Sequence, residues 1–267
     1  MKNDKFETIR KHGKTFYRAG LLLPNKTFKD LAIFYDFCRK MDDAIDEEND
    51  PSKVDLAIND LSTNYPEISN LVKKYDIPDS FLNFFLNSLK SDIAPVKLKT
   101  EKELFEYCYG VAGCVGAMAC FILRCKNSNA IYHAIDLGIA MQLTNISRDM
   151  YEDGINNRIY IPEKHTQTSL IKLAEKYYLS GKKGIKYLPF SVRPAIMTAL
   201  TNYKEVGNII VKNPDYAEKN RVIVSNKRKF LLTIYSIIKC FLLDSENAEH
   251  DKSLHEIISN LPNTHAA

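Results

Sequence analysis

Hydrophobic positions along the chain recur every three to four residues, which is the period of an amphipathic α-helix. Strict alternation of hydrophobic and polar positions, the pattern of a half-buried strand, is weak. Breaks rich in proline and asparagine separate the periodic segments, and no long Gly/Ser/Pro linker divides the chain. We therefore predict one all-α domain over residues 1–267. The predicted helices cover residues 5–20, 27–46, 51–62, 67–74, 79–92, 101–125, 128–153, 167–180, 192–212 and 225–243.

Two of the predicted helices carry oxygen-bearing side chains at intervals of four residues. These side chains are Asp42 and Asp46 on the first helix and Asn145, Asp149 and Asp153 on the second. Positions four apart lie on one face of a helix, so each row forms a stripe, and one arginine accompanies each stripe (Arg39 and Arg148). A single acidic stripe is typical of a solvated helix face. Two stripes, each with an arginine and within an apolar helix, instead favour a binding site.

Carboxylates at this spacing repel one another and destabilise a helix unless a cation lies between them. Oxygen ligands on separate helices suit hard cations such as Mg²⁺, which keep several waters and bind substrate phosphates as well as protein. Arginines can then bind the phosphates directly. The pattern predicts a site that binds a diphosphate through Mg²⁺, with Mn²⁺ as an alternative metal.

Small residues dominate the segment 107–120, where glycines recur in otherwise helical sequence. Each glycine costs a helix up to about 1 kcal/mol relative to alanine, so their presence needs a reason. Close packing of two helices is one explanation. Room for a long apolar ligand along the bundle is the other, and Ala134 and Gly138 would widen the same space. A tunnel closed by metal at one end would suit a prenyl chain with a diphosphate head.

The composition of the chain limits the kinds of partner and site that it can have. The chain is 45% hydrophobic, enough for a sizeable core, and Lys+Arg 37 against Asp+Glu 33 gives a net charge of +4. That charge is too small to indicate a nucleic-acid partner. Six cysteines without a CxxC pair favour reduced thiols in a cytoplasmic protein over zinc or disulfides. The histidines at positions 133, 165, 250, 255 and 265 share no ligand spacing, and we expect no chemical role for them.

The basic cluster at 226–229 and the apolar stretch Phe230–Leu243 bear on membrane contact. The cluster suits a solvated face, a diphosphate contact or an anionic membrane surface. The apolar stretch has about 14 residues, whereas a bilayer span needs roughly 20, so it suits a buried terminal helix or a surface resting on lipid. No apolar signal segment follows Met1. We expect a cytoplasmic protein, soluble or peripheral on the inner face of the membrane.

Five blocks of the sequence resemble the squalene/phytoene synthase family, the head-to-head trans-prenyltransferases, and above all its bacterial phytoene and dehydrosqualene synthases. The blocks are Lys14-Thr15-Phe16-Tyr17, Tyr35-x-x-Cys38-Arg39-x-x-Asp42-Asp43-x-x-Asp46, Tyr107-Cys-Tyr-Gly-Val-Ala-Gly-x-Val115-Gly116, Gln142-Leu-Thr-Asn145-Ile-x-Arg148-Asp149-x-x-Glu152-Asp153 with Arg158-Ile-Tyr160-Ile-Pro162, and Arg221-Val-Ile-Val-Ser225-x-x-Arg228-Lys229. One aspartate motif alone is a weak signal, but five blocks in the family's order are specific.

The resemblance implies a single-domain, all-α helical bundle of the trans-isoprenyl diphosphate synthase type with a central cavity. Its metal-side residues would be Asp42, Asp46, Asn145, Asp149 and Asp153. Its diphosphate contacts would be Lys14, Arg39 and Arg148, with Tyr203, Arg221, Arg228 and Lys229 closing over the diphosphate. Its prenyl tunnel would be lined by Tyr107, Val111, Val115, Ala134, Gly138 and Gln142. Further candidate substrate contacts are His12, Thr15 and Tyr35, although His12 beside Lys14 also suits a surface position.

The reaction implied by the resemblance joins two prenyl diphosphates through a cyclopropylcarbinyl diphosphate. Two geranylgeranyl diphosphates giving phytoene, for carotenoid biosynthesis, is the leading case. The alternative is farnesyl diphosphate giving squalene, dehydrosqualene or presqualene diphosphate, and only a squalene product would need NADPH. A class I terpene cyclase and a non-catalytic assembly or scaffold relative are the rival classes. Prenyl chain length, oligomeric state and the proton acceptor (Tyr107, Tyr203 or the released diphosphate) stay open.

Overall fold

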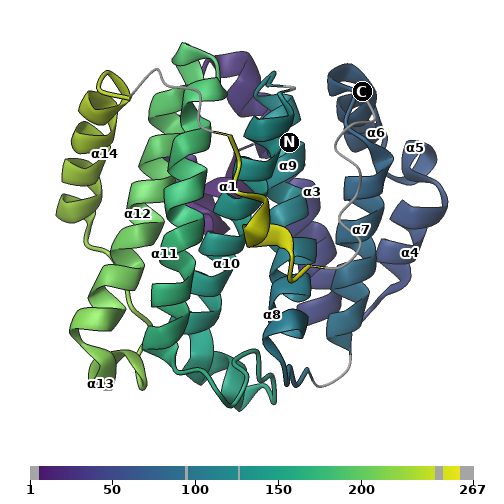
Figure 1. Cartoon of the computed structure of the whole chain (residues 1–267). Coiled ribbons are helices and arrows are strands. Elements are labelled where there is room, and N and C mark those ends of the chain that lie inside the picture. The colour runs from purple at the N-terminus through teal and green to yellow at the C-terminus, as the bar shows by residue number, and fades with distance from the viewer. Residues whose placement is uncertain (1–5, 94–95, 126, 244–248, 259–267) are drawn as a thin grey trace.

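The computed structural model describes residues 6–93, 96–125, 127–243 and 249–258 (Figure 1). Most of these residues are helical, and the β-pairing among them is one isolated parallel bridge between Lys97 and Ile159. The predicted all-α fold class is confirmed. The α-helices are α1 (Glu7–His12), α2 (Lys14–Gly20), α3 (Asn25–Asp46), α4 (Ser52–Asn59), α5 (Leu61–Asn64), α6 (Pro66–Tyr75), α7 (Asp79–Lys90), α8 (Glu101–Cys108), α9 (Cys114–Ile122), α10 (Ser128–Ile155), α11 (Gln167–Gly184), α12 (Arg193–Lys212), α13 (Pro214–Ala217) and α14 (Asn226–Cys240). The short turns are η1 (Ser91–Ile93), η3 (Ile185–Tyr187), η4 (Phe190–Val192) and η5 (Lys252–His255), all 3-10 helical, and η2 (Tyr109–Gly113), which is π-helical.

Three of the predicted helices are interrupted. The first breaks between α1 and α2 at Gly13, whose backbone leaves helical geometry and whose missing side chain lets Tyr35 approach. The segment 51–62 breaks at Asp60, which accepts a hydrogen bond from the Thr63 backbone N–H at 3.0 Å and so caps α5. The segment 101–125 contains the π-helical turn η2. Hydrophobic periodicity continues across each break, so the sequence pattern does not reveal them.

Helix α10 runs through the middle of the bundle and packs against α9, α11 and α12. Figure 1 shows α4, α5, α6 and α7 on one side of it and α12 and α14 on the other. The largest fully buried side chains include Phe81, Phe105, Tyr109, Phe121 and Tyr177, which belong to one large hydrophobic cluster. All six cysteines are described and each is a free thiol, as expected.

One helical run in the described part of the chain, Glu101–Ile122, is long and apolar enough to cross a membrane by length and composition. Its most apolar window has a mean hydropathy of 1.4, and 61% of that window is buried inside the bundle. Phe105 and Phe121 from this run are completely or almost completely buried in the large cluster. The run is therefore accounted for by the core.

The small residues of segment 107–120 permit two helices to touch through their backbones. A Cβ atom at Gly116 would lie 2.3 Å from the Ala134 carbonyl oxygen, and one at Gly138 would lie 2.3 Å from the Ala112 carbonyl oxygen. Both glycines also border the cavity described below. Close helix packing and room for a ligand, the two explanations left open by the sequence, therefore apply to the same residues.

Substituting Gly138 by alanine is expected to lower the free energy of unfolding by about 1–3 kcal/mol, because backbone atoms of η2 would have to move. Gly154, in the last turn of the same helix, has no atom within 4 Å of a built Cβ. Gly154→Ala is therefore expected to raise that free energy by up to about 1 kcal/mol. Urea unfolding of both variants measures the difference. Equal stability of the two variants would contradict the close contact.

The C-terminal segment 249–258 packs two of its histidines against α10. His250 and His255 direct their Nε2 atoms at the two carboxylate oxygens of Asp136, at 2.8 and 2.6 Å. Asp136 is completely buried and also accepts a hydrogen bond from Ser180 Oγ, which lies 2.7 Å from His133 Nδ1. We call these five residues the histidine clasp. The prediction that these histidines have no chemical role stays a prediction, but three of them meet in one hydrogen-bonded cluster that joins residues more than a hundred positions apart.

The histidine clasp resembles a metal centre in composition. Ligand atoms of His133, Asp136 and His250 lie within 4.8 Å of one another, close enough to share an ion. The Asp136 oxygens, however, are already satisfied by hydrogen bonds from His250, His255 and Ser180. Hydrogen bonds therefore satisfy the Asp136 oxygens without a metal, and the clasp links the C-terminal segment, α10 and α11, although the buried Nδ1 of His250 has no hydrogen-bond partner among the described residues.

Candidate active site

A cavity of about 920 Å³ lies within the bundle, a size typical of small-molecule sites. All the site residues predicted from the sequence border it except Arg228. Along α10, Ala134 and Gly138 come first and the row from Asn145 to Asp153 follows. The cavity wall therefore changes from apolar to polar along one helix, over about 28 Å at a rise of about 1.5 Å per residue.

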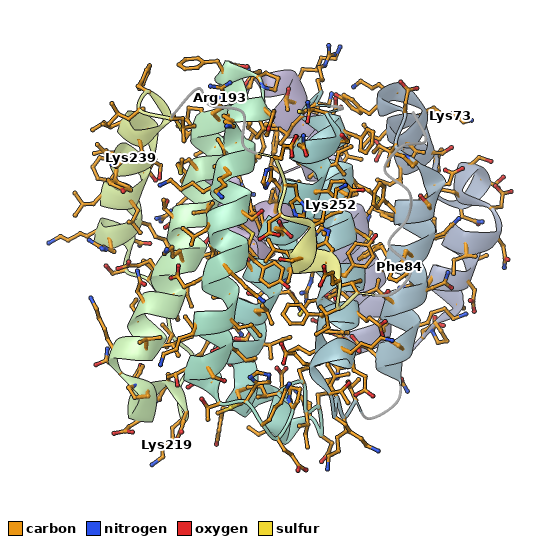
Figure 2. The ribbon with its side chains drawn as sticks, in the orientation of Figure 1. Lys73, Phe84, Arg193, Lys219, Lys239 and Lys252 are labelled. Atoms are coloured by element: carbon orange, nitrogen blue, oxygen red, sulfur yellow. The ribbon has the colours of Figure 1, made fainter. Side chains whose placement is uncertain are left out.

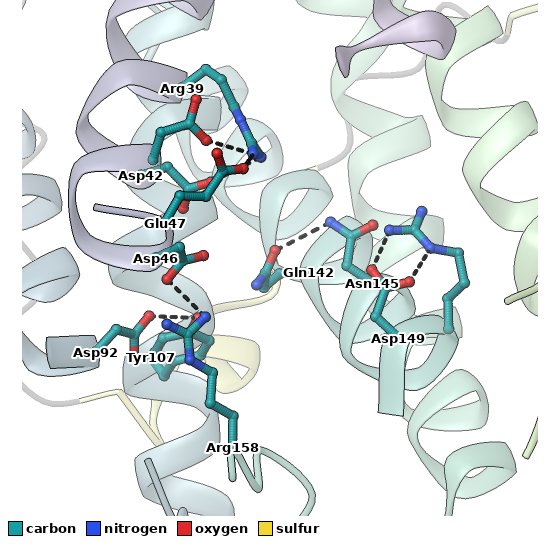
Figure 3. Close-up of polar contacts among 12 residues, drawn as sticks. Arg39, Asp42, Asp46, Glu47, Asp92, Tyr107, Gln142, Asn145, Asp149 and Arg158 are labelled. Atoms are coloured by element: carbon teal, nitrogen blue, oxygen red, sulfur yellow. Dashed lines mark hydrogen bonds and ion pairs between the residues drawn. The ribbon is translucent and has the colours of Figure 1, made fainter. Parts of the chain in front are cut away.

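The first row lies on α3, where Arg39 precedes Asp42 by one turn (Figure 3). Arg39 Nη1 lies 3.1 Å from Asp42 Oδ2, and its other terminal nitrogen lies 3.1 Å from Glu47 Oε1. Arg158, from the loop after α10, lies with its Nη1 2.8 Å from Asp46 Oδ1. Each carboxylate of the row is therefore paired with a different guanidinium.

The second row lies on α10 and has its own pair of arginines. Arg148 donates from Nε to Asp149 Oδ1 at 2.7 Å and from Nη2 to the other oxygen, a two-pronged contact. Arg221 Nε lies 3.4 Å from Asp149 Oδ1, the oxygen to which Arg148 Nε donates. Asn145 donates to Gln142 Oε1 at 3.3 Å, and its own Oδ1 is buried with no hydrogen-bond partner among the described residues. That oxygen is an acceptor without a donor.

Crowding of acids perturbs both rows. Burial, followed by the charge of Asp46, raises the pKa of Asp42 to about 7. Burial, followed by the charge of Asp149, raises the pKa of Asp153 to about 7. The side chain of Asp42 is nevertheless 40% exposed, because it faces the open cavity. The rows therefore carry negative charge that a cation in the cavity would stabilise.

In the absence of metal, the protein is expected to lose stability as the pH rises from about 4 to about 7. Over that range the folded protein keeps protons on Asp42 and Asp153, whereas the unfolded chain, with aspartate pKa values near about 3.9, has released them. The folded state binds more protons, so stability falls with rising pH. Thermal unfolding between pH 5 and pH 8 in a chelator measures the slope.

The double variant Asp42→Asn/Asp153→Asn is the control, and it should make that slope shallower, with Asp92, whose pKa is also raised to about 7, contributing to the slope that remains. Mg²⁺ with inorganic diphosphate should restore the lost stability of the unsubstituted protein at pH 8. An unchanged slope in the double variant would show that other groups cause the pH dependence.

The residues present fit a hard divalent cation. Carboxylate and amide oxygens from two helices are the ligands that Mg²⁺ and Mn²⁺ prefer. The acceptor Oδ1 of Asn145 and the raised pKa values of Asp42 and Asp153 are both consistent with a cation between the rows.

Two neighbouring basic residues at the start of α14 have different surroundings. Lys229 borders the cavity, whereas Arg228 turns to α12 and binds Glu205, with its Nε 2.7 Å from Oε1. Arg228 borders a second, smaller pocket between α12 and α14. The predicted contact between Arg228 and a diphosphate is therefore not supported by its position, because successive helical residues point about 100° apart.

Three residues of the site were not assigned from the sequence: Asp92, Arg158 and Tyr160. Backbone hydrogen bonds of 2.9 and 2.8 Å join Ile159 to Leu98 and Val96, and so fix the loop after α10 beside the segment that follows η1. Arg158 and Tyr160 flank Ile159 and reach Asp46 and Tyr107. The alternation of side chains in Arg158-Ile-Tyr160 could have indicated that Arg158 and Tyr160 point to the same side, toward the site. Asp92 had none, since it stands alone in a polar stretch.

Comparison with known proteins places this arrangement in one family. The squalene/phytoene synthase family model matches residues 9–169, more than half of the chain. The phytoene synthase of Cereibacter sphaeroides is 27% identical over 269 residues, which cover 84% of this chain and 76% of that protein. The 15-cis-phytoene synthase of Enterobacter agglomerans is 27% identical over 264 residues, covering 83% and 90%.

Solved structures agree with the sequence comparisons. The crystal structure of a dehydrosqualene synthase in complex with ligand superposes with a TM-score of 0.78 and 28% identity, over 89% of this chain and 95% of that one. The squalene synthase HpnC from Alicyclobacillus acidocaldarius has a TM-score of 0.66 at 17% identity, over 78% and 94%, and shows the fold alone. With its five sequence blocks, its all-α bundle and its two facing rows, the chain belongs to the squalene/phytoene synthase family.

Proposed function

We propose that the protein is a Mg²⁺-dependent prenyltransferase that joins two geranylgeranyl diphosphates head to head to give phytoene. One observation carries the proposal: two oxygen-bearing rows and a group of cations meet at the polar end of an otherwise apolar cavity. The phytoene synthases among its relatives support the choice of product. Residues 1–267 would act as one catalytic domain.

The cations at the cavity indicate an anionic ligand. Burial, followed by the charges of Arg18, Lys14 and Arg148, lowers the pKa of Lys229. Positive side chains that crowd one another in this way are destabilised until an anion lies among them. A diphosphate supplies that anion, and it would also lie against the metal held by Asp42, Asp46, Asn145, Asp149 and Asp153.

The reaction follows from these surroundings. When bound, the divalent cation stabilises charge on the departing diphosphate. Arg39, Arg148 and Lys14 would bind the same diphosphate and favour breaking of the allylic C–O bond. The double bond of the second substrate attacks the resulting carbocation to give a cyclopropylcarbinyl diphosphate, which ionises, rearranges and loses a proton. Apolar side chains such as Val111 and Val115 exclude water, which would otherwise capture the cations.

The decisive experiment incubates the purified protein with Mg²⁺ and radiolabelled geranylgeranyl or farnesyl diphosphate, with and without NADPH. Extracted lipids are then separated by chromatography. We expect a C40 hydrocarbon from geranylgeranyl diphosphate without NADPH. A C30 product from farnesyl diphosphate would keep the mechanism and replace the substrate. No hydrocarbon from either substrate, with folded protein, would overturn the proposed function in favour of a scaffold or cyclase.

We also propose that the protein is cytoplasmic and contacts lipid through α14. This helix lies at the outer edge of the bundle, with Lys239 projecting from it (Figure 2). Seven exposed apolar side chains lie between Phe230 and Leu242, and the segment 226–243 contains no acidic residue. Amphipathic helices of this composition bind anionic lipid surfaces.

Flotation with vesicles that contain anionic lipid tests this contact. The unsubstituted protein should float with the vesicles, and Ile234→Glu/Ile238→Glu should stay in the soluble fraction. Failure of the unsubstituted protein to float would overturn the lipid contact. Association of the protein with itself through α14 would appear instead as a larger mass in light scattering.

A further inference from the structure

A second acidic site lies directly behind the first row. Asp92, in η1, is only 6% exposed, and its Oδ2 accepts a hydrogen bond of 3.0 Å from Tyr107 Oη (Figure 3). Its Oδ1 is buried and has no hydrogen-bond partner in the described part of the chain. Neither Lys nor Arg makes an ion pair with this carboxylate among the described residues. Burying a carboxylate in this way is costly, and such a cost suggests a functional use.

Tyr107 connects this carboxylate to the cavity. The tyrosine belongs to the last turn of α8 and borders the cavity, whereas Asp92 does not. The ring of Tyr160 stacks on the Tyr107 ring at 4.9 Å, and the bridge at Ile159 holds Tyr160 in place. The π-helical turn η2 starts two residues after Tyr107 and changes the direction of the following side chains. The Tyr107 hydroxyl is therefore fixed, with its proton directed at Asp92.

The two groups have complementary acidity. Burial, followed by the charge of Asp92, raises the pKa of Tyr107 well above its usual value, so the side chain is a neutral phenol. Burial also raises the pKa of Asp92 to about 7, despite the hydrogen bond from Tyr107. A neutral phenol can accept a proton only if it passes its own proton on. Asp92 is the carboxylate to which the hydroxyl already donates.

We propose that Tyr107 and Asp92 form a two-residue proton relay that completes the reaction described under the proposed function. As a C–H bond next to the carbocation breaks, its electron pair becomes the new C=C bond. The proton moves to the Tyr107 oxygen, and the hydroxyl proton of Tyr107 moves to Asp92 Oδ2. The cation is discharged, Tyr107 is again a neutral phenol, and Asp92 is a neutral acid that releases its proton to the diphosphate or to water when the product leaves.

The relay explains why a carboxylate is placed where no ion pair supports it. A carboxylate at the apolar part of the cavity, away from the metal-side rows, would be exposed to the allylic cation and could be alkylated by it. Tyr107 instead presents a phenol to the cation, and the charge stays one residue away on Asp92. The released diphosphate, the rival acceptor, would lie at the polar rows and needs no buried carboxylate behind Tyr107.

The test compares Asp92→Asn with Tyr107→Phe. Asparagine keeps an oxygen that can accept the hydrogen bond from Tyr107, but an amide oxygen is not a base. We expect kcat to fall about 10²-fold or more in each variant while KM changes by less than about threefold. Products captured by water, prenyl alcohols, should rise as the hydrocarbon falls. The kcat of the double variant should lie within about threefold of the kcat of either single variant, because each substitution alone already removes the same relay.

Asp79→Asn, an exposed aspartate at the start of α7, is the matched control and should keep full activity. If Asp92→Asn keeps kcat within threefold, the relay through Asp92 is wrong. If Asp92→Asn does not fold, Tyr107→Phe is measured alone in folded protein. A normal rate and a normal product ratio in Tyr107→Phe would mean that the pair is only structural, and would also overturn the relay. A wild-type protein that makes no product from any prenyl diphosphate would instead refute the proposed function.

Discussion

Asp149→Ala is expected to lower kcat/KM at least about 10³-fold while leaving the fold intact. Asp149 lies between Arg148 and Arg221, and its carboxylate would be one of the ligands that hold the cation at the diphosphate. Loss of a single preorganised charge-stabilising group costs about 10² to 10³ in rate, and loss of a metal ligand also weakens metal binding. Steady-state kinetics over a range of Mg²⁺ concentrations would show both effects.

The fold should survive this substitution because the row is strained by its own charge. The charge of Asp149 contributes to the raised pKa of Asp153, so its removal relieves repulsion in the metal-free protein. Removal of Asp149 also takes away the two-pronged partner of Arg148, which opposes this gain, so the protein should remain folded at 25 °C by circular dichroism. Asp42→Ala should behave in the same way, and Glu163→Ala, an exposed acid, should change nothing. A double variant of Asp42 and Asp149 that still forms product at the normal rate would refute the metal-site assignment.

The two rows were predictable because the information is local. Residues at intervals of four on one helix share a face whatever the helix packs against. The sequence therefore indicates Asp42 with Asp46, and Asn145 with Asp149 and Asp153, before any tertiary contact is known. A shared site was a hypothesis from the two stripes with their arginines, and the family resemblance supported it, since helical periodicity does not say which helices face each other.

The residues that were missed depend on contacts between distant segments. Asp92 gains its environment from Tyr107, and Tyr160 gains its place from the bridge between Ile159 and residues 96–98. Arg228 and Lys229 are neighbours in one block, yet one borders the cavity and the other binds Glu205. A sequence block preserves order, but it does not give the rotation of a helix about its axis.

The histidine clasp gives the largest expected effect on stability. Asp136→Ala should lower the free energy of unfolding by about 3–5 kcal/mol, because the buried groups that donate to it each lose their acceptor at about 1–3 kcal/mol apiece. Burial alone would raise the pKa of Asp136, but hydrogen bonds from His250 and His255 outweigh it and lower that pKa. Without the carboxylate, both histidines and Ser180 lose their acceptor inside the protein. Urea unfolding followed by circular dichroism measures the change.

Glu256→Ala is the matched control, because this exposed acid lies in the same C-terminal segment and should leave stability within about 0.5 kcal/mol. The clasp is also separate from the polar rows, so Asp136→Ala should affect unfolding far more than the KM for a prenyl diphosphate. The experiment also decides between a hydrogen-bonded clasp and a metal centre. If the hydrogen bonds are sufficient, a chelator leaves the unfolding midpoint unchanged and Zn²⁺ does not raise it. A midpoint that rises with Zn²⁺ in the unsubstituted protein, and not in Asp136→Ala, would assign the metal to the clasp.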